Sequence, residues 1–198
     1  VSESADGESE YAYRFVDTSF NTVSSPAEAK DFRCGLFCVG DGKGKYGVTA
    51  NGEDMLLPVE YDGVFGDENG IVAVKDSTAY AFDPDMKSIG TFDIGGDGLK
   101  NNVEDARIVS PDAVCFSTLY TGTFLLTNSG KRQNISGFYD TVFYPDSGVY
   151  SVSLSVGGAV LDRDLNELFK APEGYSVNMW VLPCDIPVFY AMRSSEAI

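Results

Sequence analysis

Residues 70–87 read GIVAVKDSTAYAFDPDMK and contain the pattern that decides the fold. A glycine opens a short apolar strand at 70–74, and a second strand begins at Tyr80 and ends in an Asp-Pro-Asp turn. Runs rich in Val, Ile, Phe and Tyr are typical of buried β-strands. The stretch therefore predicts a pair of buried strands followed by a tight turn.

The first of these strands recurs along the chain at nearly regular spacing. Each copy is short and apolar and begins at a small residue or a proline. The copies begin at Gly35, Gly70, Ala113, Gly148 and Pro187, so their starts differ by 35, 43, 35 and 39 residues. A period of about 40 residues is the sequence signature of a repeat architecture.

Two further features keep register with that strand. A Thr or Asp closes the second strand of four units, and a polar residue follows four positions later; the closing residues are Thr49, Asp83, Thr127 and Asp162. Such side chains accept hydrogen bonds from the amides of a turn. An aspartate also precedes the first strand by eight residues in three units, at Asp62, Asp105 and Asp140. These offsets predict a true repeat of four antiparallel strands.

Four antiparallel strands in about 40 residues is the size of one β-propeller blade. The 198 residues and a mean spacing of 38 predict an all-β, five-bladed propeller in a single domain over 11–198. The blades are predicted at 27–59, 60–92, 103–135 and 138–170, with a fifth that combines 176–193 and 11–24. Pairing of the two ends would close the ring and protect its edge strands. The alternatives are a β-sandwich and an open β-solenoid.

Residues 44–65 permit a comparison with a known repeat. They contain an aromatic-Gly pair, an Asn-Gly turn, an apolar-Pro pair and a Tyr-Asp pair, which are Tyr46-Gly47, Asn51-Gly52, Leu57-Pro58 and Tyr61-Asp62. This order resembles the bacterial WG repeat, with a Tyr in place of the Trp. The Tyr-Asp pair recurs at 139–140, whereas the other units lack the aromatic-Gly pair. The resemblance implies an exported or surface-associated, non-enzymatic protein that acts in scaffolding or binding.

The charge balance restricts the partners. The chain has 30 acidic and 14 basic residues, a formal charge of −16, and no histidine. Nucleic acid is not expected as a partner, because phosphate binding requires a clustered basic surface. The absence of histidine excludes His-based catalytic triads and His metal sites. We expect neither a cofactor nor a metal.

The N-terminal segment bears on localisation. Residues 1–10, VSESADGESE, contain four acidic residues and no basic one, so they are predicted to form a disordered tether. Such tethers commonly follow a removed signal or lipid anchor. We therefore expect an extracellular or cell-surface monomer; the alternative is a disordered tail on a cytosolic protein. The chain has no apolar run of 18 residues that would predict a membrane-spanning helix.

The four cysteines, Cys34, Cys38, Cys115 and Cys184, contain no Cys-x-x-Cys pair. They are predicted to be buried thiols that act as small apolar side chains. One long-range disulfide is left open as an alternative.

Three aspartates and three aromatic residues are the candidate site. If the first strand of each blade is innermost, Asp62, Asp105 and Asp140 would flank a central funnel, where a glycoside hydrolase holds its two carboxylates. Residues that recur with a repeat more often hold turns, and catalysis needs carboxylates in different environments. Tyr61, Tyr139 and Trp180 are candidates for stacking on a ligand, with packing between blades as the alternative.

These patterns favour a non-catalytic, exported binding or interaction module that presents one propeller face to a protein or a glycan. A glycoside hydrolase with central carboxylates and a purely structural surface spacer are the competing hypotheses.

Overall fold

The computed structural model describes residues 2–3, 9–10, 13–95, 102–138, 141–155, 157–173, 175–181 and 187–193. Every helix or strand assigned in these ranges is a β-strand, which confirms the all-β prediction. No helix of the described chain is long and apolar enough to cross a membrane. The chain divides into two compact units, 1–101 and 102–198, and each is described by itself.

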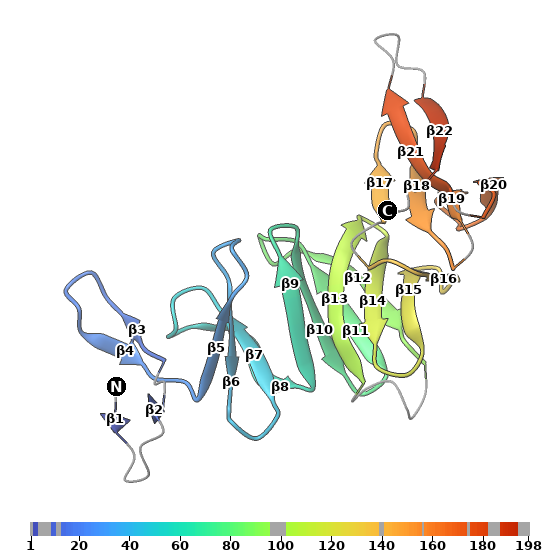
Figure 1. The fold of residues 1–198 in the computed structure, drawn as a ribbon. Helices are drawn as coiled ribbons and strands as arrows, with labels where there is room; N and C mark the ends of the chain where they lie inside the picture. Colours follow the sequence, from blue (N-terminus) through green and yellow to red (C-terminus); the bar gives the residue numbers. More distant parts are fainter. Residues whose placement is uncertain are drawn as a thin grey trace. The chain divides into compact units, whose positions relative to one another are not determined.

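The N-terminal unit contains two sheets of four antiparallel strands, each in simple up-and-down order (Figure 1). The strands of the first sheet are β5 (Glu28–Asp31), β6 (Phe37–Gly40), β7 (Tyr46–Thr49) and β8 (Met55–Tyr61). The strands of the second sheet are β9 (Gly63–Asp67), β10 (Gly70–Lys75), β11 (Thr78–Phe82) and β12 (Ser88–Asp93). The boundary between these sheets lies at Asp62, rather than between residues 59 and 60. The strand β8 continues to Tyr61, whose side chain is buried.

The C-terminal unit contains two more sheets of the same topology. The third sheet consists of β13 (Val103–Ser110), β14 (Ala113–Thr118), β15 (Gly122–Thr127) and β16 (Arg132–Ile135). The fourth consists of β17 (Val142–Tyr144), β18 (Val149–Ser153), β19 (Gly158–Asp162) and β20 (Glu167–Lys170). The four sheets confirm the prediction of repeated four-stranded antiparallel units.

Three shorter pairings lie near the two ends of the chain. The N-terminal unit has the hairpin of β3 (Phe15–Val16) and β4 (Thr22–Ser24), and the C-terminal unit has that of β21 (Tyr175–Val181) and β22 (Pro187–Arg193). Each hairpin is a sheet of two strands. Within the predicted tether, β1 (Ser2–Glu3) pairs with β2 (Ser9–Glu10); its remaining residues lie outside the described ranges.

The turn chemistry expected from the repeat is present in the structure. In four turns the amide of the first residue donates to the carbonyl of the fifth at 2.9–3.0 Å, and these turns are 17–21, 83–87, 127–131 and 162–166. The side chain of the first residue accepts a hydrogen bond from the amide of the fifth in all four. These contacts confirm that Asp83, Thr127 and Asp162 close their strands. Thr49 does so differently, because its hydroxyl accepts from the Gly52 amide at 2.8 Å.

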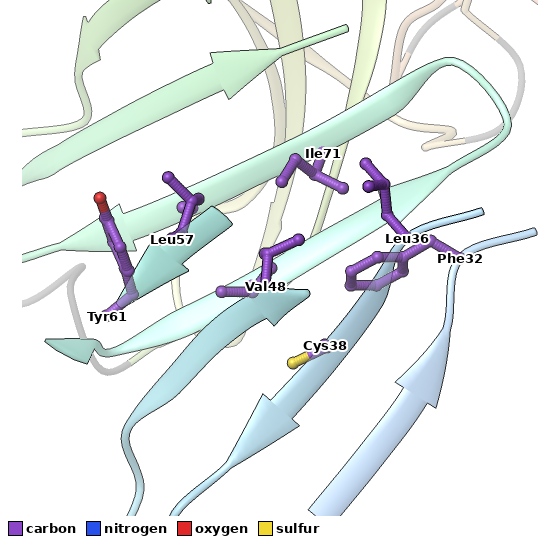
Figure 2. Close-up of a cluster of buried hydrophobic side chains, with 9 residues drawn as sticks. Phe32, Leu36, Cys38, Val48, Leu57, Tyr61 and Ile71 are labelled. Atoms are coloured by element: carbon purple, nitrogen blue, oxygen red, sulfur yellow. The ribbon is translucent and has the colours of Figure 1, made fainter. Parts of the chain in front are cut away.

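Apolar clusters lie between consecutive sheets within each unit. Figure 2 shows Val48 of β7 and Ile71 of β10 in the cluster that the first and second sheets share. The third and fourth sheets share a second cluster, which includes Leu125 and Tyr150. Alternating apolar side chains on facing strands therefore provide the interior of both units.

The described cysteines match the expectation of buried thiols in two cases. Cys38 and Cys115 are buried, and burial raises the pKa of the first thiol to about 11 and of the second to about 12. Cys34 is half-buried, and the three described cysteines are free thiols. Cys184 lies outside the described residues.

Candidate functional site

Asp62 connects the first and second sheets as a polar clamp. Its carboxylate accepts a hydrogen bond from Lys45 Nζ at 2.6 Å through Oδ1 and one from the Asp76 amide at 2.8 Å through Oδ2. Its own amide donates to the carbonyl of Val74 at 2.7 Å. Lys45 precedes β7, whereas Asp76 lies in the turn between β10 and β11. Asp62 therefore holds a strand connection in place through both of its carboxylate oxygens.

Removing either end of this clamp should destabilise the protein moderately. The Lys45 side chain is 45% exposed and that of Asp62 is 16% exposed, so solvent screens the pair and we expect a coupling energy of about 1 kcal/mol or less. The measurement is a double-mutant cycle of Lys45→Met and Asp62→Asn by urea unfolding. The coupling should decrease in 1 M salt. Strictly additive effects of the two substitutions would contradict the contact.

Tyr61 lies in the core, with a side chain that is 9% exposed. Its ring packs edge-on against Tyr80, with the ring centroids 6.1 Å apart. Burial raises the pKa of the Tyr61 hydroxyl, and the nearby Glu60 adds to this effect. The structure thus places this aromatic candidate in packing between two sheets, the alternative that the sequence left open.

Asp105 does not occupy the register position of Asp62. Asp62 precedes the ladder of β9 and β10, whereas Asp105 lies inside the ladder of β13 and β14, opposite Ser117. A register shift between Ile108 and Ser110 lies between Asp105 and the hairpin that joins β13 to β14, whereas β9 pairs with β10 without a shift. A bulge adds a residue to one strand and displaces the register of the positions beyond it. A constant sequence offset of eight residues therefore gives two different environments.

Tyr139 and Asp140 lie outside the described residues. The residues on either side of them are held by Arg107, whose guanidinium donates to the Phe138 carbonyl at 2.7 and 3.0 Å and to the Thr141 carbonyl at 2.9 Å. Bidentate donation by a planar guanidinium fixes the orientation of a backbone segment. Arg107 therefore holds the carbonyl groups of Phe138 and Thr141.

Trp180 lies on β21, opposite Val188 of β22. This agrees with its expected position on the first strand of the last unit.

The turn between β14 and β15 carries an exposed apolar pair, which was not among the candidates predicted from the sequence. Leu119 is 58% exposed and Tyr120 is 76% exposed. The Thr118 hydroxyl donates to the Gly122 carbonyl at 2.8 Å and lies 2.7 Å from the hydroxyl of Thr121. The Leu119 amide donates to the Asn102 carbonyl at 2.9 Å. The turn is thus held by its own hydrogen bonds while both apolar side chains point into solvent.

The stretch of sequence around this turn is uncharged. Residues 113–130 contain no Asp, Glu, Lys or Arg, although 22% of the chain is charged. Thr118 and Thr121 use their hydroxyl hydrogens inside the turn, so neither can donate to a ligand. The pattern that could have identified the site is this long uncharged run with two large apolar residues between its strands.

Metal-binding side chains do not gather in the part of the chain that the structure describes. Within those residues, no group of three or more Cys, Asp or Glu side chains is placed to hold an ion.

Among solved structures, the chain is similar to the crystal structure of BamB from Moraxella catarrhalis. The two sequences are 14% identical, and the TM-score is 0.42. The alignment covers 93% of this chain and 62% of that chain, so this chain spans less than two thirds of that protein. No protein-family model matches the sequence, and a search of curated proteins gives no match.

Proposed function

We propose that the protein is a non-catalytic interaction module that binds a partner protein through the turn of Leu119 and Tyr120. The observation that carries this proposal is the exposure of two large apolar side chains on a turn with fixed backbone. A rigid aromatic anchor loses little conformational entropy on binding, and tyrosines of this kind are enriched among residues that dominate binding energy.

A protein partner fits this turn better than a glycan. Sugar recognition combines an aromatic face with polar groups that hydrogen-bond the ring hydroxyls. Near Tyr120 the threonine hydroxyl hydrogens are already engaged within the turn, and Leu119 adds only apolar surface. An apolar pocket on a protein would bury the Leu119 side chain and the Tyr120 ring, with a polar group at its rim to pair with the Tyr120 hydroxyl.

The hydrolase hypothesis has less support. Both Asp62 carboxylate oxygens already accept hydrogen bonds from Lys45 and from the Asp76 amide. A general acid or base must instead reach the substrate with its carboxyl group. We propose that Asp62 has a structural role.

We also propose that the ring closes as a fifth blade made from β3–β4 and β21–β22. Each hairpin has two strands, whereas the four other repeat units have four. A cavity of 430 Å³ lies between β3 and the strands β5 and β6, lined in part by Phe15, Val16 and Phe37. A strand added along β3 would fill this apolar space and complete the blade.

Ring closure can be tested by cross-linking Val16→Cys with Val188→Cys, two positions that neighbouring strands of one blade would bring together. The double variant should form an intramolecular disulfide under mild oxidation, whereas Leu56→Cys with Val188→Cys should not. Equal cross-linking of both pairs, or of neither, would contradict the closure.

The remaining elements of the proposal are export and relationship to the WG repeat. The acidic segment at 1–10 and the Tyr46-Gly47 pair support them. Fractionation of the source cells with an antibody against the chain would test the localisation.

The interaction function is tested by placing a photo-crosslinking amino acid at position 120. Position 168 is the control, because Leu168 is an exposed apolar residue outside the turn, with 58% of its surface exposed. A partner captured only from position 120 is purified and titrated against the wild type and Tyr120→Ser. We expect binding at least tenfold weaker for the variant. Equal affinity, or capture from both positions, would refute the proposed surface. Binding on a glycan array that persists in Tyr120→Ser would favour a glycan-binding site elsewhere.

A further inference from the structure

The third sheet, which carries the turn of Leu119 and Tyr120, has one regular edge and one irregular edge. Its strand order is β13-β14-β15-β16, so β13 and β16 each have one side without a neighbouring strand. The ladder of β13 and β14 has two register shifts, whereas β15 pairs with all four residues of β16 without a shift. Bulges are one device by which a protein protects a sheet edge from a further strand. The edge of β16 lacks this protection.

The last strands of the other three four-stranded sheets are irregular. The ladders that pair β8, β12 and β20 with their neighbours each contain a register shift, and β8 also contains Pro58. Proline cannot donate a hydrogen bond to an added strand. The strand β16 reads RQNI, so it is short and mostly polar, unlike the long apolar edges that aggregate. A regular edge of this kind is suited to specific pairing with another chain.

The backbone groups of Arg132 and Asn134 point away from β15. The Thr127 amide donates to the Lys131 carbonyl at 2.9 Å, so these two residues form a hydrogen-bonded pair. Hydrogen-bonded and non-hydrogen-bonded pairs alternate along an antiparallel ladder, so Gln133 bonds to β15 while Arg132 and Asn134 face outward. The Gln133 side-chain amide donates to the Asn134 carbonyl at 2.9 Å, which agrees with a carbonyl outside the ladder. Two backbone N–H groups are therefore available along this edge.

The regular edge ends beside the exposed turn. Ile135, the last residue of β16, pairs with Thr123 near the start of β15, and the turn of Leu119 and Tyr120 directly precedes β15. Neighbouring strands of a sheet lie about 4.8 Å apart, so a strand added to β16 would lie about 10 Å from β15. A residue that flanks such a strand can contact the Tyr120 ring. One extended segment would therefore use both the edge and the turn.

Arg132 determines which side chain an added strand should carry. Its guanidinium carbon lies 3.7 Å from the centroid of the Phe124 ring, and its Nε donates to Asn134 Oδ1 at 3.3 Å. These contacts hold the guanidinium over the face of the sheet. Its terminal N–H groups have no partner in the part of the chain that the structure describes. An acidic side chain on a neighbouring strand would pair with them.

We propose that a partner binds the third sheet by β-augmentation. An extended segment adds to β16 in the antiparallel direction, with an acidic side chain beside Arg132 and an apolar residue against Tyr120. Antiparallel addition continues the pattern of this sheet and is slightly more stable per residue than parallel addition. The inference deepens the proposed function and rests on it, because it names the form of the segment that the partner presents.

Asn134→Pro tests the added strand, with Asn134→Ala as the matched control. Both variants lose the side-chain amide, but proline also removes the outward N–H, which the ladder with β15 does not use. The probe is a phage-displayed library of random peptides of about 12 residues, long enough to span β16 and reach the turn, selected on the full wild-type chain. The selected peptides should contain an acidic residue and bind Asn134→Pro about tenfold more weakly than Asn134→Ala. Failure to enrich any peptide, or equal binding by the two variants, would overturn the proposal.

Exchange rates of single amides, measured by NMR, test the strand without a variant. A selected peptide should slow the exchange of the Arg132 and Asn134 amides, which face outward in the free chain. The Gln133 amide is already in the ladder with β15, so its exchange should be slow with and without the peptide. Unchanged exchange at 132 and 134 would contradict an added strand, even if Asn134→Pro proved too unstable to use.

The same peptides separate this inference from the proposed function. Weaker binding to both Tyr120→Ser and Asn134→Pro supports both. Weaker binding to Tyr120→Ser alone leaves the turn as the binding surface and overturns the added strand. Weaker binding to Asn134→Pro alone supports the strand and refutes the role of Tyr120. Sedimentation of the wild type as a dimer that Asn134→Pro dissociates would identify a second copy as the occupant and overturn the assigned partner.

Discussion

Gly47→Ala is expected to lower the free energy of unfolding by about 2–3 kcal/mol, because the new methyl group would have no room. A Cβ at Gly47 would lie 2.6 Å from the Leu57 carbonyl oxygen and 2.9 Å from the Pro58 carbonyl carbon. Both atoms belong to the backbone of β8, so a rotamer change cannot relieve the overlap. Urea unfolding at neutral pH measures the loss.

Gly40→Ala is the matched control for this substitution. Gly40 is also in a strand of the first sheet and is also buried, but its added Cβ would meet only side-chain atoms, at 3.1 Å from Glu28 Cβ and from Tyr46 Cε1. Both substitutions reduce the entropy of the unfolded chain equally, a stabilising contribution of about 0.4–1 kcal/mol. Gly40→Ala should therefore change stability by less than about 1 kcal/mol. Equal losses in the two variants would contradict the close approach of β7 and β8.

This close approach explains the glycine of the Tyr46-Gly47 pair in physical terms. The ladder of β7 and β8 has register shifts on both sides of Val48, so the two backbones approach each other at Gly47. Next to it, Tyr46 is half-buried. Burial raises the pKa of its hydroxyl, and the negative charge of Glu28 raises this pKa further. An aromatic residue followed by glycine thus provides both packing and a narrow crossing between two strands.

The strands and turns could be predicted because local chemistry determines them. Short runs of apolar residues mark the strands, and the Asp or Thr that closes a strand makes its hydrogen bonds within five residues, as Asp162 does with Asn166. Their spacing then gives the repeat. None of these inferences depends on which sheet packs against which.

The site could not be predicted to the same extent because it depends on register and on exposure. The bulge of β13 between Ile108 and Ser110 changes the register of Asp105 relative to that of Asp62, although the sequence offset is the same. The alternation of apolar and polar residues along a strand does not predict that the Tyr61 ring packs against Tyr80 of the neighbouring sheet. The exposure of Leu119 and Tyr120 follows from a turn that Thr118 fixes, and a single apolar pair carries no period that would reveal it.

Tyr150→Phe should lower the stability at neutral pH by about 1–2 kcal/mol, because it breaks a buried network. The Tyr150 hydroxyl lies 2.7 Å from Ser110 Oγ and donates to Asp112 Oδ1 at 3.1 Å, and its side chain is fully buried. Phenylalanine keeps the ring contact with Phe143, whose centroid is 4.9 Å away, so the loss reports the hydroxyl. Ser110→Ala is the companion variant, and double-mutant additivity would contradict a shared network.

Tyr150 should also make the free energy of unfolding decrease at alkaline pH. There Tyr150→Phe is expected to become more stable than the wild type. Burial raises the pKa of Tyr150 to about 12, opposed by the hydrogen bond with Ser110 and reinforced by the charge of Asp112. In the unfolded chain the hydroxyl titrates near pH 10, so between pH 10 and about 12 the unfolded state releases a proton that the folded state retains. The contribution of Tyr150 is complete below pH 10 and declines by as much as about 2.7 kcal/mol by pH 12.

Tyr150→Phe has no such group, while Cys38 and Cys115 titrate equally in both proteins. The unfolding free energies of the two proteins, measured in urea from pH 8 to 12, should therefore converge and then cross, and parallel curves would show that the Tyr150 hydroxyl is not buried in this network.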